Sequence, residues 1–256
     1  MNVTHIIPRS KEDLERRRRA FEIVAAATAG MMGRTPDYLN VTFACFAGRA
    51  DVWARRGNEQ GAANLVAYQK HQAFTRAYVK LLFAFGLGHL IGTATGVTRF
   101  DHVREKLGQI WNLVELTRSG IVAAEAGSAP DEAGVWCPDE RPFLALRGEM
   151  PKWMPKANEL LQLVGGGGFM CTPSEADVKG PMADVVAKYF QAAGADAERR
   201  IRLFRLAWDF LGSDLGRRGE LYERFYLSDS FRMTGVAYNL ADKTEAVELV
   251  EQFLRD

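Results

Sequence analysis

The segment Gly33–Tyr38 (Gly-Arg-Thr-Pro-Asp-Tyr) combines turn-forming residues with two side chains that can bind an oxygen atom. Its glycine lets the backbone leave a helix, and Pro36 fixes its own φ and keeps the preceding threonine out of the helical region. We therefore expect a stiff turn that presents Arg34 and Tyr38 from nearby points. Both side chains can donate a hydrogen bond to an anionic or phenolic ligand. A plain connection between two helices, with a surface arginine, is the alternative interpretation.

The residues on both sides of this turn resemble the 4-hydroxyphenylacetate 3-hydroxylase family, the oxygenase halves of two-component aromatic hydroxylases that use reduced flavin. In that family the arginine and tyrosine that match Arg34 and Tyr38 contact the phenol oxygen of the substrate, and the resemblance implies the same catalytic role here. A cation near a phenol favours its phenolate form, which is the better nucleophile. The resemblance is carried by Met32–Val41, Pro8–Leu14, Tyr68–His71 and segments from Phe74 through Leu254, including Trp111–Thr117 and Leu221–Tyr226.

A glycine tract late in the chain is the second candidate site, because glycines let backbone amides approach a phosphate closely. By the family resemblance, this tract and the glutamine before it meet the diphosphate or adenine end of FAD, often across a contact between subunits. The alternative is a flexible loop, and no strand precedes the tract as the Rossmann pattern requires. The residues concerned are Gln162, Gly165, Gly166, Gly167 and Gly168.

A third candidate segment also resembles a family stretch that lies against the dinucleotide. Its serine and aspartate could bond ribose or amide groups, and the implied cofactor-binding residues are Tyr226, Ser228 and Asp229. The alternative is a helix end followed by a cap for the next helix.

Helices must position these side chains, because apolar residues recur at helical spacing and no run alternates as a strand does. We expect an all-α protein in which residues 128–138 form a loop. The predicted helices cover residues 10–29, 39–56, 59–96, 101–126, 141–150, 155–164, 196–211, 219–225 and 242–254, with a short helix within 177–194.

Two predicted helices carry aromatic side chains that we expect to face inward. Trp111 is expected on the buried side of the helix over 101–126. The helix over 196–211 is strongly amphipathic, and its predicted inward residues are Ile201, Phe204, Leu206, Trp208 and Phe210.

The resemblance also implies a domain organisation. Family members have an N-terminal helical domain, a middle β-domain and a C-terminal helical bundle, in the manner of acyl-CoA dehydrogenases. This chain runs from the first helices into the bundle, with the join near Lys70–Phe74, so that the middle β-domain is absent. We expect domains over residues 1–71 and 72–256. A family histidine that helps to hold the phenol belongs to the absent part, and His71 does not match it.

The composition excludes several other classes of protein. There are 33 Lys and Arg residues against 32 Asp and Glu residues, so no net charge attracts nucleic acid or anionic lipid. The cysteines Cys45, Cys137 and Cys171 are far apart, which predicts neither a disulfide framework nor a metal site. We expect a cytoplasmic protein, since the sequence shows no secretory signal and no run of about 18 uncharged apolar residues.

The resemblance implies a 4-hydroxyphenylacetate 3-monooxygenase-like oxygenase component that uses O₂ and reduced FAD from a separate flavin reductase. Its substrate would be a small phenol, and it would form a homo-oligomer. Without the β-domain, which provides one wall of the family's water-free cavity, activity is expected to be impaired. One alternative is a catalytically silent helical remnant that serves as an oligomerisation or binding scaffold. Another is a truncated gene product without a selected role.

Overall fold

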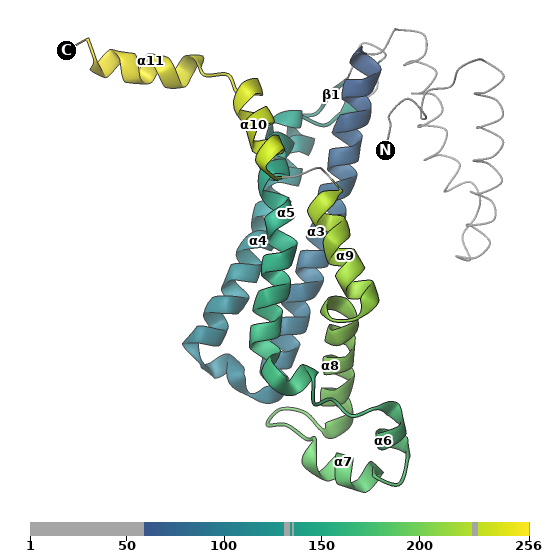
Figure 1. Ribbon diagram of the computed structural model, residues 1–256. Coiled ribbons are helices and arrows are strands. Elements are labelled where there is room, and N and C mark those ends of the chain that lie inside the picture. The colour runs from purple at the N-terminus through teal and green to yellow at the C-terminus, as the bar shows by residue number, and fades with distance from the viewer. Residues whose placement is uncertain (1–58, 131–133, 135, 227–229, 256) are drawn as a thin grey trace, which may run out of the picture. The chain divides into compact units, whose positions relative to one another are not determined.

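A computed structural model of the chain describes residues 59–130, 134, 136–226 and 230–255, with side chains from Gln69 onward (Figure 1). The chain divides into two units, residues 1–69 and 70–256, and only the second is described below. The predicted catalytic pair Arg34 and Tyr38, and the helices predicted over 10–29 and 39–56, lie outside the described residues. The predicted domain boundary between residues 71 and 72 stays a prediction.

The first described helix, α3 (Glu59–Thr95), is the single long helix that the sequence predicts across the join. Its buried side chains, among them Phe74, Leu81 and Ile91, enter three separate clusters of the core. By length and composition alone, residues Gln69–Thr95 could cross a membrane, a property that the sequence analysis did not anticipate. The central helix of a folded bundle has the same composition, and 44% of the most apolar window is buried here.

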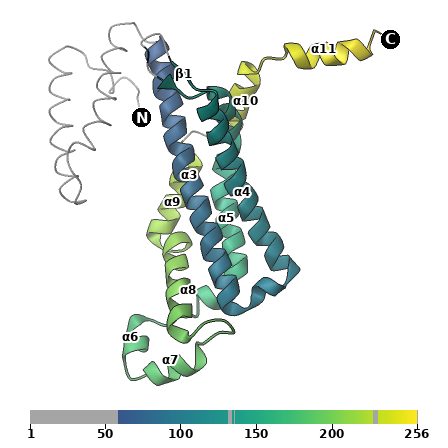
Figure 2. The ribbon, with the colours of Figure 1, turned by 180° about the vertical axis from the view of Figure 1, so that it is seen from behind.

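Two further long helices run beside α3 in both views of the bundle (Figures 1 and 2). The first, α4 (Asp101–Ala126), has the predicted bounds and buries Leu107, Ile110 and Val114. The prediction that Trp111 faces inward is wrong, because this side chain is 40% exposed, although its ring lies 5.0 Å from that of Phe85 between centroids. A 3₁₀ turn, η2 (Val97–Arg99), connects α3 to α4.

The loop predicted over residues 128–138 contains a short antiparallel pair, β1 (Ala129–Pro130) and β2 (Trp136–Cys137). Ala129 pairs with Cys137 and Pro130 with Trp136. Each strand has only two residues, and so short a segment carries no alternation of apolar and polar residues from which a strand could be predicted. These strands are the only ones in the described residues, where the middle β-domain is not evident, and the all-α prediction is confirmed.

The helix α5 (Glu140–Gly165) corrects the prediction of two separate pieces marked by prolines. Both Pro151 and Pro155 lie inside one continuous helix. Each proline removes a backbone donor and costs a helix interior about 3 kcal/mol in isolation. Burial of the neighbouring side chains, Met150 and Met154 among them, outweighs that cost, because these residues form part of the core between α3 and α4.

The remaining helices are shorter, and the predictions locate most of them. In α8, Ile201 and Phe204 are buried as predicted, but Leu206 and Trp208 are 47% and 42% exposed, whereas Leu203 and Ala207 are buried. The helix α10 was not predicted, and α9 begins five residues earlier than expected. Their bounds are η3 (Gly166–Phe169), α6 (Glu175–Lys179), α7 (Ala183–Tyr189), α8 (Ala197–Leu211), α9 (Asp214–Phe225), α10 (Ser230–Leu240) and α11 (Thr244–Phe253).

Candidate flavin-binding segments

The glycine tract forms a tight corner at the end of α5. The helix ends at Gly165, and residues Gly166–Phe169 then turn as the 3₁₀ helix η3. Gly166 has a φ of 55° and a ψ of −145°, a backbone conformation that side chains with a Cβ rarely adopt, and its N–H donates to the carbonyl of Gln162. The tract therefore forms a tight corner between α5 and the segment that follows.

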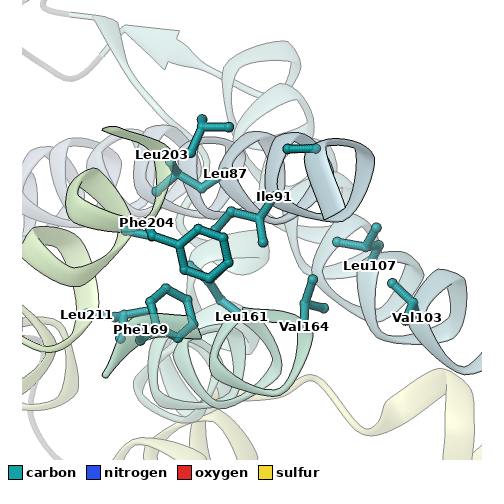
Figure 3. Packing of buried hydrophobic residues seen from close by; sticks show 12 residues of the cluster. Leu87, Ile91, Val103, Leu107, Leu161, Val164, Phe169, Leu203, Phe204 and Leu211 are labelled. Atoms are coloured by element: carbon teal, nitrogen blue, oxygen red, sulfur yellow. The ribbon is translucent and has the colours of Figure 1, made fainter. Parts of the chain in front are cut away.

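Packing explains two of the four glycines. A Cβ on Gly165 would collide with the ring of Phe169, and a Cβ on Gly168 would collide with the ring of Phe204. These two rings contact each other, with centroids 5.2 Å apart, and close one end of the core between α5 and α8 (Figure 3). Gly165 and Gly168 are thus required by the fold whether or not a ligand binds.

The other two glycines leave the corner open. A Cβ on Gly166 or Gly167 would meet nothing within 4 Å, and both residues are exposed. One turn earlier, the half-buried amide of Gln162 forms no hydrogen bond with any described residue. An exposed backbone without Cβ atoms and a free amide are suited to a phosphate or an adenine edge. These residues fit the diphosphate or adenine end of a dinucleotide.

Tyr226, the described residue of the third candidate segment, belongs to an aromatic and cationic cluster between α3 and α9. Its ring stacks on Tyr222, with centroids 4.8 Å apart. The Arg76 guanidinium carbon lies 4.7 Å from the centroid of Tyr222 and 4.6 Å from that of Tyr226. The Tyr226 hydroxyl donates to Gln72 Oε1 at 3.4 Å. Ser228 and Asp229 lie outside the described residues.

A buried carboxylate holds this cluster together. Glu223 is 1% exposed and accepts hydrogen bonds from Arg76 at 2.8 and 3.0 Å and from Lys80 at 2.6 Å. Burial alone would raise the pKa of the Glu223 carboxyl, but the bonds from the two cations outweigh it and lower that pKa below its ordinary value. Burial opposes the charged form of Arg76, yet its pKa is raised by the carboxylate.

Sequence reasoning missed Arg76, Lys80 and Glu223. The available signal was a pair of cations four residues apart within an apolar stretch of α3, since a charge in such a stretch needs a buried partner. The partner itself lies 147 residues from Arg76, and nothing in the local pattern identifies it.

The described structure does not bring the two flavin-binding candidates together within one chain. Tyr226 contacts Gln72 and Arg76, whereas Phe169 beside the glycine corner belongs to the core cluster of Ile91. From Arg76 to Ile91 the helix advances about 15 residues, or roughly 22 Å. A single diphosphate therefore cannot touch both segments of one copy.

The residues at the predicted join are held by side chains of the bundle. Lys70 is 2% exposed and donates to Glu140 at 2.7 Å. His71 Nε2 lies 2.8 Å from Glu125 Oε1, and its ring meets the edge of Phe143. His71 thus packs against α4 and α5, in a structural position.

No group of three or more potential metal ligands occurs among the described residues. Of the three cysteines, Cys137 and Cys171 are not in disulfides, and Cys45 lies outside the described part of the chain.

Comparison with known proteins identifies relatives of the whole chain. Residues 60–255 match the family model described as 4-hydroxyphenylacetate 3-hydroxylase C terminal, and residues 1–82 match its N-terminal counterpart. The 4-hydroxyphenylacetate 3-monooxygenase oxygenase component of Thermus thermophilus is 32% identical over 199 residues, which are 78% of this chain and 41% of the relative. A probable 4-hydroxyphenylacetate 3-monooxygenase of Bacillus subtilis is 30% identical over 73% of this chain and 39% of its own length.

A solved structure gives the same result. An oxygenase component of 4-hydroxyphenylacetate 3-monooxygenase, complexed with FAD and 4-hydroxyphenylacetate, superposes with a TM-score of 0.72 at 31% identity, over 80% of this chain and 42% of that one. The chain therefore spans about two fifths of the length of these relatives. The two family ranges overlap over residues 60–82, a stretch that contains the predicted join.

Proposed function

Because the chain belongs to the 4-hydroxyphenylacetate 3-hydroxylase family, we propose that it is a shortened and impaired oxygenase component of a flavin-dependent aromatic hydroxylase. The observation that carries this proposal is the family match over residues 60–255, together with the superposition on an oxygenase that binds FAD and 4-hydroxyphenylacetate. We propose the same class of substrate, a small phenol, and the same cofactor.

Reduced FAD would come from a separate flavin reductase, as the name oxygenase component implies for the relatives. When bound, reduced FAD would supply the two electrons that activate O₂, so that one oxygen atom is added to the phenol ring and the other is reduced to water. We propose a cytoplasmic homo-oligomer, because the family resemblance implies one.

The roles of the residues follow from their chemistry. Arg34 and Tyr38 would hold the phenol oxygen and favour its ionised form. Gln162 and the exposed backbone of Gly166 and Gly167 would bind the diphosphate or adenine end of FAD, while Gly165 and Gly168 permit the close packing that shapes the corner. The segment Tyr226–Asp229 would contact the dinucleotide from its other side.

A titration of the purified chain with FAD, followed by flavin fluorescence or absorbance, tests this proposal. We expect weak, saturable binding that Gly167→Ala loosens, because the new methyl group occupies the open side of the corner. Gly108→Ala in α4 is the matched control, since its Cβ also meets nothing within 4 Å, and it should leave FAD binding unchanged. Absence of saturable binding by either oxidised or reduced FAD would contradict the proposal.

A second candidate function is a helical scaffold without catalysis. It is favoured by the buried core clusters that join α3, α4 and α5 although no middle β-domain is evident in the described residues. A folded, self-associating chain that binds no FAD in the same titration would support the scaffold instead of the hydroxylase.

A further inference from the structure

The last helix of the chain, α11, is amphipathic and has no covered face. Every residue from Thr244 to Phe253 is exposed, and Figures 1 and 2 both show the helix beyond α10 and away from α3, α4 and α5. Its apolar side chains share one side at helical spacing. This apolar side consists of Ala246, Val247, Leu249, Val250, Phe253 and the following Leu254.

The charges on α11 are all negative. At 3.6 residues per turn, Glu245 and Glu251 lie at the two edges of the apolar side, whereas Glu248 lies opposite it. A surface that matches this helix would be an apolar strip with positive charges at its edges.

The outer face of α9 has this character. Leu221 and Phe225 are 54% and 61% exposed and lie on the side of the helix away from the buried Glu223. Arg218 and Arg224 are exposed and flank this strip on either side by helical spacing. Beyond the first residue of α9, its exposed charged side chains are all basic: Arg217, Arg218 and Arg224.

We propose that the apolar side of α11 docks on the outer face of α9 in a second copy of the chain, with the edge glutamates against Arg218 and Arg224. A second copy is the occupant because α11 extends away from the α9 of its own chain in both views, while the charges of the two helices are complementary (Figures 1 and 2). Lys243 donates to the carbonyls of Tyr238 and Ala241 at 2.7 and 3.1 Å, and its ammonium lies 4.5 Å from the centroid of the Tyr238 ring. These contacts tie Lys243, the residue before α11, to the end of α10.

Such an exchange is reciprocal, since each copy provides one α11 and one α9, and it closes as a symmetric pair. The inference rests on the proposed self-association and is independent of flavin chemistry. It adds the surface and the residues through which two copies would meet.

Sedimentation velocity of the full chain across micromolar concentrations tests the docking with two charge reversals. One variant is Glu245→Arg with Glu251→Arg on α11, and the other is Arg218→Glu with Arg224→Glu on α9. Each places like charges against one another in both copies, and we expect each to raise the dissociation constant about tenfold or more. An equimolar mixture of the two variants should restore association, because each α11 then meets an α9 of opposite charge.

Matched controls make the same change of charge elsewhere. Glu248→Arg lies on the polar side of α11, and Arg199→Glu lies on the exposed side of α8, so both should associate like the unaltered chain. If a reversal fails to give a helical circular dichroism spectrum, the glutamine substitutions at the same positions replace it, and a smaller loosening is expected.

Three outcomes would overturn the docking proposal. A monomeric unaltered chain would remove both this inference and the proposed self-association. An associated chain whose dissociation constant is indifferent to both reversals would leave self-association in place and reject the α11–α9 surface. Failure of the mixture to associate better than either variant alone would also reject it.

Discussion

The carboxylate of Glu223 on α9 accepts two hydrogen bonds from the guanidinium of Arg76 on α3, of 2.8 and 3.0 Å. The same guanidinium lies over the rings of Tyr222 and Tyr226. One arginine therefore orients both the buried end of α9 and the first residue of a segment proposed to contact FAD. This geometry makes Glu223 a stability determinant with a predictable pH dependence.

Replacing Glu223 with Gln should destabilise the chain by about 3 kcal/mol at neutral pH, because it leaves two partly buried cations without their counter-charge. The free energy of unfolding from urea titration measures the loss. Glu248→Gln on the exposed α11 is the control for loss of one carboxylate and should be close to neutral. A near-neutral Glu223→Gln would show that water satisfies Arg76 and Lys80 equally well.

The contribution of Glu223 should vanish in acid. Its pKa in the folded chain is lower than the ordinary value of 4.5. The stabilisation is therefore present in full above about pH 4.5 and is lost as the pH falls through the folded-state pKa. Urea titrations of the unaltered chain and of Glu223→Gln should differ at pH 7 and converge as the pH drops below 4.5. A difference that persists unchanged into acid would mean that the carboxylate charge does not matter.

Substitutions of two adjacent glycines in the corner should affect stability and FAD binding differently. Gly168→Ala should cost about 2 kcal/mol, because its new Cβ must displace the ring of Phe204 from the core. Gly167→Ala should leave the free energy of unfolding almost unchanged, since nothing lies within 4 Å of that Cβ, and should weaken FAD binding only. Thermal unfolding of both variants shows which glycine the fold requires, and FAD titration shows which one the ligand requires. Equal stabilities would show that Phe204 moves freely.

The prolines in α5 give a fourth prediction. Pro155→Ala should stabilise the chain by about 1–2 kcal/mol, because the new N–H can donate to the carbonyl of Pro151 within an unbroken helix. Pro151→Ala is the comparison, and it should gain less, since Pro151 is buried and loses packing. Differential scanning calorimetry measures both changes. A lower unfolding temperature for Pro155→Ala would indicate that the proline fixes a bend that the bundle needs.

The sequence predicts those elements whose local signals and packing agree. The helix across the join and the bounds of α4 follow from uninterrupted periodicity between clear turn residues. The break expected in α5 is wrong because the local cost of two prolines is smaller than the burial of Met150 and Met154, a tertiary term that no local pattern contains. The helix α10 was missed although Met233, Val236, Ala237 and Leu240 recur on it at helical spacing, and of these only Met233 is buried.

The candidate site, too, was predicted from the sequence only in part. Its glycines were located by resemblance, but only the structure shows what constrains each one. The rings of Phe169 and Phe204 leave no room for a Cβ on Gly165 or Gly168, and the positive φ of Gly166 favours glycine. Gly167 meets neither constraint. Trp208 was assigned to the core from the amphipathic pattern of its helix and from its position seven residues after Ile201. In the structure it is 42% exposed, whereas Leu203 and Ala207 are buried. The Arg76–Glu223 pair joins segments far apart in the sequence, and such a pairing is a property of the tertiary structure.

The most direct test of the proposed function supplies the chain with reduced FAD, O₂ and 4-hydroxyphenylacetate and measures the catechol product against hydrogen peroxide. We predict that oxygen is consumed mainly with release of hydrogen peroxide and little catechol. The residues proposed to hold FAD and the phenol are in the sequence, but the family's β-domain, which helps to exclude water, is not evident in the described residues. Efficient catechol formation, coupled to oxygen use and lost in Arg34→Ala, would contradict the predicted impairment and show that the short chain is a complete hydroxylase.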